Sequence, residues 1–125
     1  MKKKILIFTA ILGLIYLCGN LFLGVENKNP LFPHIDTHFS KDFSFDKWDN
    51  VRRGFTKDTV IKILGEPLVI RSEKLSPFRP PCAVYEMCYS GDGAWGYSDF
   101  AWEAFYIYLD SNNVVIAKSR DWMFD

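Results

Sequence analysis

The stretch Val51-Arg-Arg-Gly-Phe-Thr-Lys-Asp-Thr-Val-Ile-Lys-Ile-Leu-Gly-Glu-Pro67 places helix-ending signals close to helix-starting signals. Gly54 can take the left-handed backbone conformation that ends a helix, because it has no Cβ. Thr56 can accept a hydrogen bond from an amide of the next turn, as an N-cap residue does. Gly65 repeats the role of Gly54. The stretch therefore predicts one helix that closes at Gly54 and a second, short helix from Thr56 to Leu64.

The second predicted helix has one apolar face. Val60 and Leu64 are four residues apart, so they lie on the same side of a helix. Asp58 falls in the first turn, where the helix dipole favours negative charge, and Pro67 prevents the helix from resuming. A short helix of this kind needs an apolar surface to cover, which indicates a sheet beneath it.

The spacing of these residues resembles the signature of the SmpA/OmlA (BamE-like) family of small bacterial envelope lipoproteins. The residues that carry the resemblance are Val51, Gly54, Thr56, Val60, Leu64, Gly65 and Pro67. This chain has Phe55 where the family usually has methionine, and the change keeps a large apolar side chain. The resemblance extends loosely over Lys41 to Asp125. It implies a role in outer-membrane assembly, through binding of other proteins or of anionic lipid.

Length and charge narrow the class of protein. The chain has 125 residues, which leaves room for one domain once its ends are set aside. Lys2–Lys4 are three of the 15 basic residues, so 12 basic side chains face 15 acidic ones downstream, a net charge of −3. No basic surface that could offset phosphate repulsion is expected, which argues against nucleic-acid binding.

The N-terminal run Ile5–Val25 contains no charged residue and follows Lys2–Lys4 directly. As a helix it would be about 31 Å long, roughly the thickness of bilayer hydrocarbon. One interpretation is a signal anchor that keeps the lysines in the cytoplasm and exports the rest. The other is a lipoprotein signal cleaved before Cys18, which would then be lipidated. Signal peptidases need small residues beside the cut, so the bulky Tyr16 and Leu17 favour the anchor, and the inner over the outer membrane.

Residues 26–40 are interpreted as a linker, because they contain Pro30 and Pro33 and show no sustained period. On a helix, His34 and His38 would share a face and could bind a metal. Pro33 and the lack of a second ligand cluster instead favour surface histidines, so no metal or cofactor is expected. We therefore predict an anchor or signal over residues 1–25, a linker over 26–40 and a folded domain over 41–125.

The first helix of the domain is predicted over Phe43–Arg53, with Ser44 as its N-cap. Phe45 and Trp48 are three residues apart and are expected to face the core. The two arginines that end this segment are expected in the last helical turn, where the dipole favours cations.

Three strands are predicted after the helices, over Ala83–Tyr89, Trp102–Leu109 and Val114–Lys118. Alternation in the first strand places Val84, Glu86 and Cys88 on one face and Tyr85, Met87 and Tyr89 on the other. In the middle strand Phe105, Ile107 and Leu109 point inward, opposite Trp102, Tyr106 and Tyr108. A hairpin turn at Asp110–Asn113 leads to the third strand. Aromatic side chains on both faces of the middle strand predict that its outer face is partly covered, by the linker or by a partner.

The predicted fold class is therefore α+β, a two-helix corner packed on a three-stranded antiparallel sheet, with an N-terminal transmembrane or signal helix. Three cysteines are too few for a disulfide framework. In one extended strand Cys82 and Cys88 would be about 20 Å apart, which favours buried free thiols. A bend after Pro81 in an oxidising compartment would still allow a disulfide.

Two loops carry the candidate partner-binding residues. The segment Arg71–Pro81 is stiffened by three prolines, and it either contacts a partner or covers an edge of the sheet. The segment Gly91–Phe100 is rich in glycine and aromatic residues, and it either folds back on the domain or supplies interface anchors. The candidate residues are Phe78, Arg79, Trp95, Tyr97 and Phe100.

An enzyme would need a nucleophile with a base, a metal cluster or paired carboxylates in a suitable place, and the sequence offers none of these. We therefore expect a non-catalytic, membrane-tethered envelope protein without a small-molecule substrate. Its domain faces the periplasm or the cell exterior and acts as an assembly or adaptor module for another envelope protein. The alternative is an inhibitor or immunity-type protein that binds and blocks an exported enzyme, because secreted β-lactamase inhibitors share this architecture.

Overall fold

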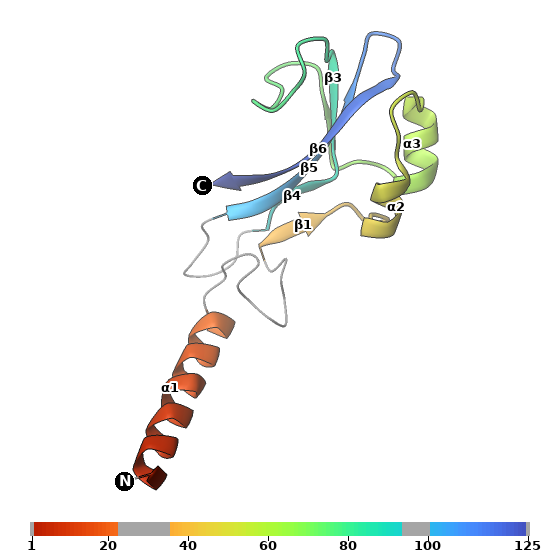
Figure 1. The fold of residues 1–125 in the computed structure, drawn as a ribbon. Helices are drawn as coiled ribbons and strands as arrows, with labels where there is room; N and C mark the ends of the chain where they lie inside the picture. Colours follow the sequence, from red (N-terminus) through yellow and green to blue (C-terminus); the bar gives the residue numbers. More distant parts are fainter. Residues whose placement is uncertain (1, 23–35, 94–100, 125) are drawn as a thin grey trace.

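The computed structural model describes residues 2–22, 36–93 and 101–124 (Figure 1). The predicted N-terminal helix is present as α1, Lys2–Phe22. Among the residues described in full, no helix combines the length and the apolar character needed to cross a membrane.

The folded part is α+β, as predicted, with antiparallel sheets. Its elements in chain order are β1 (Thr37–Phe39), α2 (Phe45–Asn50), α3 (Lys57–Leu64), β2 (Val69–Arg71), β3 (Tyr85–Cys88), β4 (Ser90–Asp92), β5 (Ala101–Leu109) and β6 (Val115–Phe124). One sheet has the order β2-β3-β5-β6, and a second, smaller sheet pairs β1 with β4. The three predicted strands form the antiparallel ladder β3-β5-β6, whereas β2 and the small sheet were not predicted.

The predicted N-caps of both helices and the predicted end of the second helix at Gly65 are confirmed. The Ser44 hydroxyl accepts a hydrogen bond from the amide of Lys47 at 3.3 Å, and Thr56 Oγ1 accepts one from the amide of Thr59 at 3.3 Å. Gly65 ends α3 with φ +80°, in the left-handed region where a side chain is strained. The caps are local features, so short-range sequence rules were sufficient to find them.

The first helix ends at Asn50, so the prediction that it continues to Gly54 was wrong. Val51 is extended (φ −72°, ψ 128°) and only 1% exposed, because its side chain turns into the core. Gly54 does have a positive φ of +91°, and its amide donates to the carbonyl of Val115 at 2.8 Å. This hydrogen bond links the segment between α2 and α3 to β6. Arg52 and Arg53 lie outside the helix, so the prediction that they occupy its last turn, where the dipole favours cations, was wrong.

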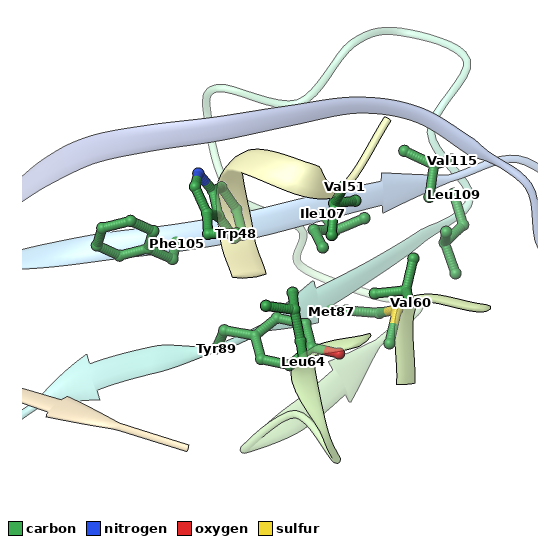
Figure 2. Packing of buried hydrophobic residues seen from close by; sticks show 10 residues of the cluster. All are labelled: Trp48, Val51, Val60, Leu64, Met87, Tyr89, Phe105, Ile107, Leu109 and Val115. Atoms are coloured by element: carbon green, nitrogen blue, oxygen red, sulfur yellow. The ribbon is translucent and has the colours of Figure 1, made fainter. Parts of the chain in front are cut away.

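Figure 2 shows the core between the helices and the sheet. Its buried members are Trp48, Val51, Val60, Leu64, Met87, Tyr89, Phe105, Ile107, Leu109 and Val115. The predicted alternation of β3 and β5 is confirmed, because these strands send Met87, Phe105 and Ile107 into this cluster. Trp48 meets Phe105 edge to face, with ring centroids 5.0 Å apart. Phe45 contacts the cluster at its rim and remains 38% exposed.

The folded part begins earlier than predicted. The linker was predicted over residues 26–40, but residues 36–40 belong to the folded part. Strand β1 pairs with β4, and the Thr37 hydroxyl accepts a hydrogen bond from the amide of Glu103 at 2.9 Å. Phe39 stacks on Phe43 with ring centroids 4.9 Å apart. Strand β1 has only three residues and follows two prolines, so its alternation was too short to be recognised in the sequence.

Strand β6 continues to Phe124, well past the predicted end at Lys118. The charge on Arg120 is accommodated by the carboxylate of Glu103. The guanidinium of Arg120 also lies over the ring of Phe105, 5.3 Å from its centroid. These contacts stabilise the charged side chain of Arg120 within β6. The alternation of apolar residues did not extend to this position, so the strand was predicted to end before it.

Candidate functional site

The candidate site is the loop of residues 72–84 that joins β2 to β3, which we call the proline loop (Figure 1). It contacts side chains of Glu86 and Tyr108, which belong to the sheet face opposite α2 and α3. The sequence predicted that this outer face is covered by the linker or by a partner. In the structure the proline loop covers part of it.

Two consecutive turns give the proline loop its shape. In the turns Ser76–Arg79 and Pro80–Ala83, the amide of the last residue donates to the carbonyl of the first, at 3.3 and 3.0 Å. Pro77 and Pro81 occupy the second position of these turns, where the fixed φ of proline is favourable. The loop is therefore pre-ordered, as the sequence predicted.

Ser76 anchors the proline loop to the sheet. Its amide donates to Glu86 Oε2 at 2.7 Å, and its hydroxyl lies 2.7 Å from the hydroxyl of Tyr108. The Tyr108 hydroxyl is also 3.0 Å from the hydroxyl of Ser119 on β6. Ser76 is 5% exposed and Glu86 is fully buried, so water competes little for these hydrogen bonds. The proline loop is thus linked to three strands of the sheet.

Glu86 is a buried carboxylate whose charge is balanced within the site. Its Oε1 lies 3.4 Å from Arg71 Nη1 and accepts a hydrogen bond from the Cys88 thiol at 3.4 Å. Burial raises the pKa of Cys88 to about 12, and the nearby Glu86 charge acts in the same direction. Burial likewise raises the pKa of Tyr106 to about 12. These groups stay protonated and neutral at neutral pH, so Arg71 supplies the positive charge opposite the carboxylate, and the Ser76 amide and the Cys88 thiol donate hydrogen bonds to it.

The proline loop displays two of the predicted partner-binding residues. Phe78 is 45% exposed, and Arg79 is exposed beside it. The other candidates, Trp95, Tyr97 and Phe100, lie outside the described residues. Cys18 is half-buried in α1. The structure therefore shows Phe78 and Arg79 exposed on the same loop, and it does not test the candidates in the segment Gly91–Phe100.

Sequence reasoning missed the residues that hold the proline loop, namely Arg71, Ser76, Glu86, Tyr108 and Ser119. One signal was available. Glu86 interrupts the apolar residues of β3 at a position that alternation places on a covered face. A carboxylate at such a position requires a cation or several donors, which indicates an anchoring role.

The cysteines are free in the structure, in agreement with the favoured prediction, but Cys82 is exposed rather than buried. Because only the thiolate reacts with alkylating agents, the raised pKa and burial of Cys88 should make it inert. We expect iodoacetamide at about pH 8 to modify Cys82 and to leave Cys88 unmodified until the protein is unfolded in urea. Peptide mass spectrometry measures each site separately, and equal modification in the folded protein would contradict the buried position of Cys88.

Comparison with protein-family models, with curated proteins and with solved structures finds no match for this chain. The resemblance to the SmpA/OmlA family therefore stays a prediction. Within the described ranges, no group of three or more histidine, cysteine or acidic residues is placed to hold a metal ion.

Proposed function

We propose that the protein is a non-catalytic, membrane-tethered interaction domain that binds a partner protein through the proline loop. The observation that carries the proposal is the contrast between Phe78, a large apolar side chain that is 45% exposed, and Ser76, two residues away and 5% exposed. A loop that is already ordered loses little conformational entropy on binding, and an exposed aromatic side chain supplies apolar area.

The ionisable groups of the site support a binding role rather than a catalytic one. Glu86 is occupied by the Ser76 amide, Arg71 and the Cys88 thiol, and it is fully buried. A general acid or base must reach its substrate, whereas this carboxylate faces the underside of the loop. We therefore assign Glu86 to holding the loop.

We further propose that the N-terminal segment tethers the domain to a membrane, with the domain on the exported side. The support is the uncharged run Ile5–Val25 after Lys2–Lys4, together with the resemblance of the stretch Val51–Pro67 to envelope lipoproteins. We expect the mature chain to keep Lys2–Lys4 and to take up no acyl label in cells. A mature chain that begins at acylated Cys18 would replace the anchor by a lipoprotein and favour the outer membrane.

Photo-crosslinking tests the binding role directly. A photoreactive amino acid is placed at Phe78 in the full chain, in its own cells, and at Phe124 as a matched control. Phe124 is 80% exposed, so it is the more accessible of the two aromatic positions. We expect a discrete protein adduct from position 78 and none of comparable yield from position 124. An envelope-assembly protein in the adduct supports the adaptor role, and an exported hydrolase or toxin supports the inhibitor alternative. The absence of any protein adduct at position 78 contradicts the proposal.

A further inference from the structure

Strand β2 is an edge strand with apolar side chains exposed on both faces. It ends the order β2-β3-β5-β6, and among the described residues it pairs only with β3. Leu68, immediately before β2, and Val69 and Ile70 within it are 41%, 40% and 39% exposed, although neighbouring residues of a strand point to opposite faces. An edge of this kind presents backbone donors and acceptors, flanked by apolar groups, to a further strand.

The two edges of the four-stranded sheet differ in their charged side chains. The β6 edge carries Lys118, Arg120 and Asp121, and charges on an edge strand oppose pairing with other chains. The one charged residue of β2 is Arg71, whose Nη1 contacts the buried Glu86. Lys118 and Arg120 are exposed on β6, whereas Val69 and Ile70 on β2 are exposed and carry no charge.

The charge around β2 indicates what kind of strand it would accept. Residues 68–81 contain three basic residues and one acidic residue, whereas the chain after Lys4 is acidic overall. Arg71, Lys74 and Arg79 are all exposed. A second copy of this chain would place two such basic stretches side by side, which is unfavourable. An acidic segment would be attracted, and the guanidinium of Arg71 has further N–H groups to offer it.

We propose that β2 accepts an added strand from a partner protein, an extended apolar segment that carries acidic side chains near Arg71 and Lys74. Main-chain hydrogen bonds to the edge would provide affinity, and the acidic side chains would provide selectivity. The inference rests on the proposed function, because the same partner would contact the adjacent Phe78.

Crosslinking at Ile70 tests the added strand separately from the role of Phe78. With the photoreactive amino acid at position 70 of the full chain, we expect the same protein that position 78 captures. Mass spectrometry should place the adduct in an apolar segment that contains at least one acidic residue. Capture of a second copy, of lipid, or of nothing at position 70 overturns the inference and leaves the proposed function standing if position 78 captures its partner. If neither position captures a protein, both fall.

Charge variants add a quantitative arm, read as adduct yield from position 78. Ile70→Lys and Lys74→Glu should each reduce the yield by about fivefold or more, because they place a charge on the edge or reverse one beside it. Phe124→Lys is the matched control, since Phe124 is 80% exposed and lies on β6, outside both β2 and the proline loop. Equal yields from all three variants overturn the inference. If a variant does not fold, as judged by its melting curve, the adduct from position 70 in the otherwise unchanged chain decides.

Discussion

Replacing Gly65 with valine is expected to lower the free energy of unfolding by about 2 to 5 kcal/mol, the sum of backbone strain and steric overlap. Gly65 has φ +80°, a conformation that a β-branched residue adopts only with strain. A Cβ built at this position would lie 2.6 Å from the Cβ of Asp42, so the segment before α2 would have to move as well. Urea unfolding of the full chain in detergent, followed by tryptophan fluorescence, measures the change.

Gly54→Val is the matched control for this prediction. Gly54 has a similar φ of +91°, but among the described residues other than its chain neighbours no atom lies within 4 Å of the Cβ that it would gain. Only the strain remains, so a smaller loss of about 1 to 2 kcal/mol is expected. Equal losses at Gly54 and Gly65 would contradict the close approach of Asp42 to the end of α3.

Replacing Glu86 with alanine is expected to release the proline loop and to cost about 2 to 3 kcal/mol of stability. The buried amide of Ser76 would lose its acceptor at 2.7 Å, and Arg71 would lose its counter-charge. The amide penalty should be the larger of the two, because the Arg71 side chain is 43% exposed and water can solvate it. Hydrogen exchange at the Ser76 amide should accelerate more than exchange in β5.

Two variants separate the anchoring role of Glu86 from a general loss of acidic charge. Glu86→Gln keeps an acceptor oxygen for the Ser76 amide. Hydrogen exchange at that amide should therefore accelerate less in Glu86→Gln than in Glu86→Ala. Glu73→Ala removes an exposed carboxylate from the same loop and should change stability by less than about 0.5 kcal/mol. Unchanged exchange of the Ser76 amide in Glu86→Ala would show that the carboxylate does not hold the loop.

The parts of the fold that could be predicted from the sequence depend on short-range signals. The caps at Ser44 and Thr56 act within three residues, and the alternation in β5 follows from the pleat of a strand. The end of α2 could not be predicted in this way. Val51 leaves the helix with its side chain packed in the core, and the amide of Gly54 bonds to Val115 of β6, and both are tertiary effects.

The candidate site shows the same division. The prolines predicted a stiff loop, and Phe78 was a candidate for partner contact, because both inferences follow from local residue types. The anchor depends on Ser76 reaching Glu86, ten residues away, and Tyr108, 32 residues away. No spacing rule links residues so far apart. The one indication in the sequence was Glu86, an acidic residue among the apolar residues of β3.

We propose above all that the proline loop presents Phe78 to a partner protein. The most direct test compares affinity capture by the full chain, solubilised from membranes, with capture by Phe78→Ala and by Phe124→Ala. Both variants remove an exposed phenylalanine, and Phe124 exposes the larger surface, at 80% against 45%, so a loss confined to Phe78→Ala reflects the position of Phe78. The claim predicts that Phe78→Ala reduces recovery of the partner by about tenfold or more and that Phe124→Ala leaves it unchanged. Equal recovery by the two variants would contradict it.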